Sequence, residues 1–153
     1  MASKSKIKIR DNTDLRIELE TNTNLISQIN LSKWAISVAK HVLSYLDREF
    51  PNNEKIEDGF NVIESWQKGE ATVHQVRQAG FRVHEVAREC KSETARAAAR
   101  AVGQAVGVGH MKEHAMVAAD YAIKVVGLDS QWDMNRITEE REWQLKELMP
   151  YIK

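Results

Sequence analysis

The sequence contains little cysteine and proline and has no excess of charge of either sign. Its 153 residues include one cysteine, Cys90, and two prolines, Pro51 and Pro150. A single thiol cannot form an internal disulfide, and a chain of this length buries enough surface to fold without one. Nothing therefore indicates an oxidising compartment, and we expect a cytoplasmic protein.

The charge balance and the lack of a long hydrophobic run argue against two further classes. Lys and Arg together number 22, and so do Asp and Glu, which is unlike a protein that coats nucleic acid through many phosphate contacts. The most apolar segment, residues 97–111, contains Arg100 and His110 and is shorter than the roughly 18 apolar residues of a membrane span. The basic run in residues 4–10 precedes no apolar stretch, unlike a secretory signal. We expect neither a membrane span nor direct nucleic-acid binding.

Helical periodicity dominates most of the chain. Between Pro51 and Pro150 no proline interrupts a pattern in which apolar residues recur at intervals of three and four, as on the buried side of a helix. The pattern predicts one all-α domain over residues 1–153, a helical bundle of about five to seven helices. We place its helical body in residues 30–148, with residues 1–28 as an N-terminal extension that packs on the bundle.

Several helix starts can be recognised from capping residues. Asn52 and Asn53 follow Pro51 and offer a cap for the next helix, and Ser92 can cap the alanine-rich segment, because their side-chain oxygens accept from the first free N–H groups. Thr72 and Gln75 have the spacing of a capping box. These residues predict three separate helices in the middle of the chain.

The N-terminal extension fits two structures. Apolar and charged residues alternate at Ile7 and Ile9 and again from residue 15 to residue 19, which favours a short β-hairpin. In the alternative, a short helix begins at Asp14 and places Leu15 and Leu19 one turn apart. The sequence pattern supports the two structures about equally.

An Ala/Gly-rich segment, residues 93–127, is predicted to lie at the centre of the bundle, because small side chains let neighbouring helices approach closely. Its glycines, each less favourable than alanine by roughly 1 kcal/mol in a helix, allow either one kinked helix or two abutting helices. If the segment is helical throughout, one face carries a polar stripe that includes Arg96, Arg100, His110, His114 and Tyr121.

His110 and His114 are the candidate metal ligands, because two histidines four residues apart can reach one ion from a single helix turn. A third ligand would come from His41, His74, His84 or Asp120 on other helices. The alternative is that these histidines are buried and bonded to protein groups. Cys90 continues an apolar seam and is predicted to be an unreactive core thiol.

The residues resemble the immunity proteins of bacterial polymorphic toxin systems, the group numbered five and its close relatives. The resemblance covers residues 31–127 and rests on the order and spacing of eight segments: LSKWA (31–35), AKHVL (39–43), FP (50–51), WQKG (66–69), AGFRVHEVAR (79–88), AAARAVG (97–103), HMKEHA (110–115) and ADYA (119–122). It implies an all-α protein that binds and neutralises a cognate toxin by occlusion, with no catalysis. We expect a monomer or a homodimer without a cofactor. His41, His84, His110 and His114 fall on histidine positions of the family pattern.

Two acidic surfaces are candidate contacts for such a toxin, if the toxin is basic: Glu54, Glu57 and Asp58, and Glu139, Glu140 and Glu142. Complementary charge of this kind gives specificity and fast association. The alternative function is a metal-binding helical bundle or a metal-dependent enzyme that uses His110 and His114 with His41 or His84.

Overall fold

The structure is a computed structural model that describes residues 3–152 and contains eight α-helices and one 3-10 helix. The elements follow one another along the chain as α1 (Thr13–Thr23), α2 (Gln28–His41), α3 (Leu43–Asp47), α4 (Glu54–Gln67), α5 (Val73–Glu89), α6 (Glu93–Gly107), α7 (His114–Ser130), α8 (Met134–Leu148) and η1 (Met149–Tyr151). No β-strand occurs in this described part of the chain. The all-α class predicted from the sequence is confirmed.

Side-chain caps fix where most helices begin. Asn53 accepts from Lys55 and Ile56 at the start of α4, and Ser92 accepts from Ala95 at the start of α6. Thr72 and Gln75 form a capping box at the start of α5, which satisfies N–H groups that the first helical turn leaves free. The three predicted helix starts are confirmed.

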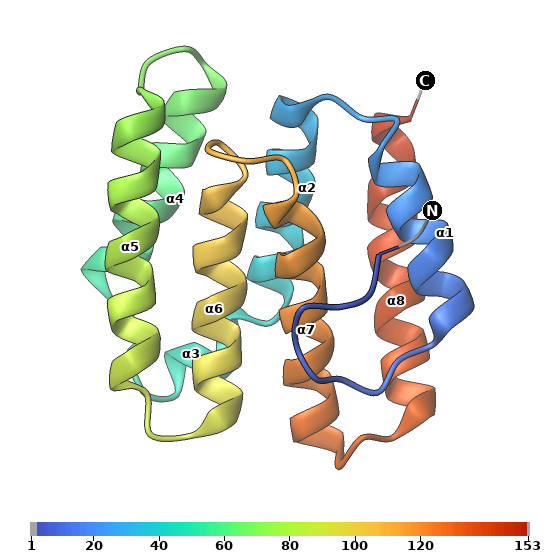
Figure 1. Cartoon of the computed structure of the whole chain (residues 1–153). Helices are drawn as coiled ribbons and strands as arrows, with labels where there is room; N and C mark the ends of the chain where they lie inside the picture. The colour runs from blue at the N-terminus through green and yellow to red at the C-terminus, as the bar shows by residue number, and fades with distance from the viewer. Residues whose placement is uncertain (1–2, 153) are drawn as a thin grey trace.

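The helices α6 and α7 form the centre of the bundle. They pack on each other, α5 flanks α6, and α8 flanks α7 (Figure 1). On one side α2 covers both central helices, α4 packs on α5, and α1 packs on α8 at the far end. The alanines of α6 and α7 are almost all buried, which explains why the two helices can lie so close together.

The N-terminal segment crosses the outer face of α7 before α1 begins (Figure 1). Its end is held by Asn12, whose side chain caps α1 by accepting from Leu15. The inward positions of α1 are Arg16, Leu19 and Thr23. The β-hairpin prediction is wrong and the helical alternative is correct. Helix α1 begins at a polar cap and has an arginine, Arg16, at an inward position, so its helical period is hard to distinguish from an alternation of apolar and charged residues.

The number of helices also exceeds the predicted five to seven. The Ala/Gly-rich segment is two helices, since Gly107 ends α6 and residues 108–113 form a turn before α7. The first long helical segment also breaks, at Val42, whose φ of −113° lies outside helical geometry. No helix within residues 3–152 is long and apolar enough to cross a membrane.

Candidate functional site

A cavity of about 270 Å³ opens between α5, α6 and the start of α7. Its lining includes three of the histidines that the sequence singles out, together with glycines and one exposed aromatic ring: Gly80, Phe81, His84, Gly103, Gln104, Gly107, His110 and His114. Phe81 is 53% exposed. The cavity therefore combines an apolar wall with several polar groups, which is the usual composition of a binding site.

Two glycines of α6 make room for two of the imidazole rings. The ring of His84 lies against Gly103, where an added methyl group would overlap it. One turn further, a methyl group on Gly107 would lie 3.1 Å from Cδ2 of His114. The missing side chains of α6 thus shape the cavity wall, because any larger residue would displace the rings.

Both rings are oriented by hydrogen bonds from α6. Arg100 donates to Nδ1 of His84 over 2.8 Å, and Nδ1 of His114 lies 2.6 Å from Oε1 of Gln104. Because a guanidinium can only donate, Nδ1 of His84 carries no proton and its Nε2 is the N–H donor. Neither Nε2 atom has a hydrogen-bond partner within residues 3–152, and neither is a buried unpaired atom, so both remain available to a ligand.

The electrostatics of the cavity keep His84 and His114 neutral. Burial and the positive charges of Arg100 and Arg88 lower the pKa of His84 to about 4. Burial and the neighbouring His110 and Lys6 also lower the pKa of His114. At neutral pH both rings are therefore uncharged, and they lie beside the positive charges of Arg77 and Arg100.

The predicted polar stripe forms a second cavity beside the first. Arg96, Arg100 and Tyr121 line it together with Glu93 and Lys124, and its volume is about 130 Å³. Arg100 reaches both cavities, since it also bonds His84. The structure thus brings Arg96, Arg100 and Tyr121 together, although the Ala/Gly-rich segment forms two helices, α6 and α7, and not one continuous helix.

The candidate metal ligands divide into two places. His84, His110 and His114 share the first cavity, where the ring centroids of His110 and His114 lie 5.9 Å apart. His41 lies elsewhere, stacked on Trp143 with 3.5 Å between centroids. Among residues 3–152, no three His, Cys, Asp or Glu side chains are grouped so as to hold a metal ion.

The two acidic surfaces differ in how free their charges are. Glu54 and Glu57 are exposed in the first turn of α4. Glu139 and Glu142 are exposed in the middle of α8. Asp58 is paired with Arg82 over 2.9 Å.

Glu140 differs from the expectation that it forms part of an exposed surface. It is only 8% exposed, and its Oε2 lies 2.8 Å from Nδ1 of His41. It faces the bundle because it falls on the inward side of α8, next to Arg141.

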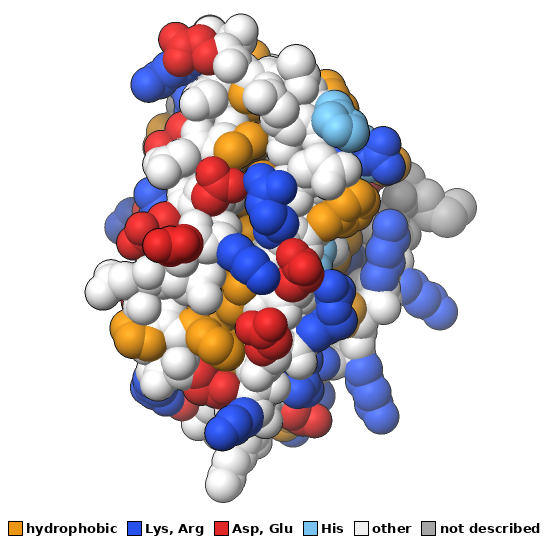
Figure 2. All heavy atoms as spheres, turned by 90° about the vertical axis from the view of Figure 1, so that its left-hand side faces the viewer, with side chains coloured by type: hydrophobic (Ala, Val, Ile, Leu, Met, Phe, Trp, Pro, Cys, Tyr) orange, Lys and Arg blue, Asp and Glu red, His pale blue; other side chains and the backbone are white. Residues whose placement is uncertain are grey.

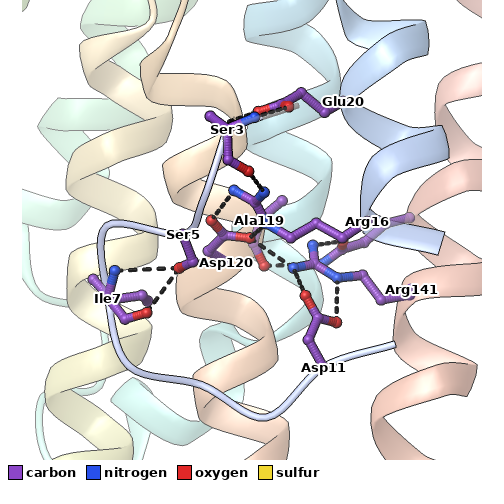
Figure 3. Close-up of polar contacts among 10 residues, drawn as sticks. Ser3, Ser5, Ile7, Asp11, Arg16, Glu20, Ala119, Asp120 and Arg141 are labelled. Atoms are coloured by element: carbon purple, nitrogen blue, oxygen red, sulfur yellow. Dashed lines mark hydrogen bonds and ion pairs between the residues drawn. The ribbon is translucent and has the colours of Figure 1, made fainter. Parts of the chain in front are cut away.

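A buried charge network joins the N-terminal segment, α1, α7 and α8 (Figure 3). Arg16 donates two hydrogen bonds to Asp120, over 3.0 and 2.8 Å. Arg141 donates two to Asp11, over 2.9 and 2.7 Å, and a third to Asp120 over 2.6 Å. Asp120 and Arg141 are each 1% exposed. Two guanidiniums and two carboxylates balance one another, which is the condition for burying ions.

Of the residues in this network, only Asp120 was predicted to be functional, as a candidate metal ligand. Arg141 and Gln144 lie between the buried Ile137 and Leu148 of α8, at helical intervals of four, three and four. That spacing was a usable signal, because polar residues in the inward positions of a helix need partners in the core.

These observations define an all-helical protein with a histidine-lined cavity flanked by arginines. The chain belongs to the family of Imm-5 like putative immunity proteins, which matches residues 21–151. The resemblance seen in the sequence is thus confirmed, and the match extends beyond residues 31–127 into α1 and α8. No curated protein and no solved structure matches the chain.

Proposed function

We propose that this protein is an immunity protein that binds a cognate toxin of a bacterial polymorphic toxin system and neutralises it in the cytoplasm by covering the toxin's active site. The observation that carries the proposal is family membership over residues 21–151. The protein acts by binding, so it needs a rigid surface with a few strong anchors rather than reactive groups.

The surface around the histidine cavity supports this proposal. Phe81 is exposed there, and the guanidinium carbon of Arg77 lies 5.9 Å from the centre of its ring. Aromatic and arginine side chains are the residue types that most often dominate binding energy at protein interfaces. They project from α5, which packs on both α4 and α6. Because the backbone of α5 is already held in place, little backbone conformational entropy is lost when a partner binds.

The test uses the purified full chain as bait in lysate of its source organism. We expect one stoichiometric partner that stops growth when its toxic domain is expressed alone. Co-expression with the immunity protein should restore growth, and the two purified proteins should elute as one complex.

The control is co-expression with a variant of unchanged fold. Lys33→Glu serves this purpose, since Lys33 is exposed on α2, away from the cavity. A retained partner that is harmless by itself, or that stays toxic beside an excess of the folded wild-type protein, contradicts the proposal.

A further inference from the structure

The protein as a whole has no net charge, yet its basic side chains are not evenly distributed. Six of them, from the N-terminal segment, α5, α6 and α7, lie around the two cavities. Arg77 lines the first cavity and Arg100 bonds His84 there, Arg88 and Lys6 lie close enough to lower the pKa of His84 and of His114, and Arg96 and Lys124 line the second cavity. None of the six forms an ion pair with a carboxylate of the described residues 3–152. We call the surface that carries these six residues the basic face.

The surface between α4 and α5 is electrostatically balanced. Arg82 pairs with Asp58 and Lys55 with Glu85 there. Figure 2 views the molecule from that side, and acidic and basic side chains alternate across the centre, whereas Lys and Arg project along the right-hand edge, on the side that faces the viewer in Figure 1. The basic side chains of the basic face thus differ from Arg82 and Lys55 in having no carboxylate partner within residues 3–152.

We propose that the basic face is the toxin-binding surface and that its partner is an acidic protein surface, whose carboxylates are held by Arg77, Arg88 and Arg100 around the histidine cavity. This inference rests on the proposed function. It reverses the charge signs expected from the sequence, in which the acidic residues of α4 and α8 contact a basic toxin.

The cavity adds space for a side chain, a hydrogen-bond donor and an apolar contact to the positive charge of the basic face. A volume of about 270 Å³ exceeds the roughly 30 Å³ share of one water molecule several times, so it accepts a protein side chain. Nε2–H of His84 is a neutral donor with no partner in residues 3–152, and Phe81 supplies apolar contact. A carboxylate that enters thus finds donors from both histidine and arginine.

The same observations favour a protein partner over nucleic acid and over a cation. Glu93 lines the second cavity beside Arg96 and Arg100, and Glu113 lies close enough to affect the pKa of His114. These two carboxylates interrupt the positive charge and would repel a continuous line of phosphates, whereas the carboxylates of a protein surface can be spaced so as to avoid them. A cation in the cavity would be repelled by Arg88 and Arg100, which already lower the pKa of His84.

A direct binding test needs no knowledge of the toxin. The probe is hexaglutamate with blocked ends, titrated into the ¹⁵N-labelled full chain while the amide signals of Gly80, Gly103 and Gly107 are followed. We expect saturable shifts of these signals that weaken with added salt, whereas blocked hexaglutamine causes none. Shifts confined to other helices would overturn the proposal, as would stronger binding of hexathymidylate than of hexaglutamate at the same amides.

Charge reversal provides matched variants. The double variant Arg77→Glu/Arg88→Glu should bind hexaglutamate at least about tenfold more weakly. Lys33→Glu/Lys146→Glu makes the same change of charge at exposed sites on α2 and α8 and should stay within about twofold of wild type. Equal weakening in both double variants would show attraction by total charge alone and would overturn the proposal.

The toxin assay separates this inference from the proposed function. If Arg77→Glu/Arg88→Glu loses neutralisation and Lys33→Glu/Lys146→Glu retains it, the basic face is the interface. If neutralisation instead survives in the first variant and is lost when Glu54, Glu57, Glu139 and Glu142 become lysine, the assignment of the basic face fails while the immunity function stands. If wild type itself never neutralises a toxin, the function fails, and the peptide titration still reports on the basic face.

Discussion

Replacing Asp120 with asparagine tests whether the buried charge network stabilises the fold through charge balance. The substitution keeps the size of the side chain but removes the carboxylate that accepts three hydrogen bonds from Arg16 and Arg141. Two guanidiniums then face the single carboxylate of Asp11. Because removing one partner from a buried ion pair leaves an uncompensated charge, we expect a loss of about 3–5 kcal/mol in the free energy of unfolding.

The assay is urea unfolding followed by circular dichroism, with thermal unfolding as a second measure. A loss of that size corresponds to a decrease in Tm of roughly 6–20 °C for a chain of this length. The matched control is Asp58→Asn, because the side chains of Asp58 and its partner Arg82 are 49% and 44% exposed. Breaking that surface pair should change the free energy of unfolding by about 0–1 kcal/mol.

A second substitution isolates the charge imbalance from other effects. Adding Arg16→Met to Asp120→Asn leaves one guanidinium, on Arg141, opposite Asp11, so the combined loss should be clearly smaller than the sum of the two single losses. A loss below about 1 kcal/mol for Asp120→Asn, or additive losses in the double variant, would refute the reasoning that charge balance holds this network.

Four further outcomes follow from the cavity and from the buried thiol. Gly103→Ala should lower the free energy of unfolding by about 1–3 kcal/mol in urea titrations, because the new methyl group displaces the ring of His84; unchanged stability would show that the ring moves freely. The pKa of His84, about 4, lies below its ordinary value of 6.5, so stability should be complete above pH 6.5 and fall by about 1–2 kcal/mol as the pH drops toward 4. The slope should be smaller in His84→Gln, and the remainder is expected from His114, whose pKa is also lowered. Cys90, which is 3% exposed and whose pKa is raised to about 11 by burial, should resist thiol reagents at pH 8 until urea unfolds the chain. Added zinc should leave Tm unchanged, since Arg100 occupies Nδ1 of His84; a rise in Tm that His110→Ala abolishes would favour the metal-binding alternative.

Much of the helical body could be predicted because its signals are local. Asn53, Ser92 and the Thr72–Gln75 box cap their own helices, and a cap depends only on residues within one turn. The break at Val42 was missed, and the hairpin prediction was wrong, for the opposite reason. Both depend on which side of a helix faces the core, and tertiary packing decides that.

The site was partly predictable. His110 and His114 were predicted to act together with either His41 or His84, and the structure places His84 beside them and His41 elsewhere. That choice depends on how α5, α6 and α7 pack. No local pattern indicates that Arg100 bonds His84 or that Glu140 turns inward toward His41, because both contacts join different helices. The basic face was missed because net charge sums over all residues, whereas its charges come from segments that are separated along the chain.

The charge network also sets when the molecule can be completed during its synthesis. Arg16 and Asp120 are 104 residues apart, and Asp11 and Arg141 are 130 residues apart. At the usual pace of translation this separation is a delay on the order of ten seconds. During that time α2 to α7 can assemble through contacts between successive helices, while α1 has left the ribosome without α8 to pack on. Helix α1 is thus held in place only after α8 has been made, although it is synthesised well before α8.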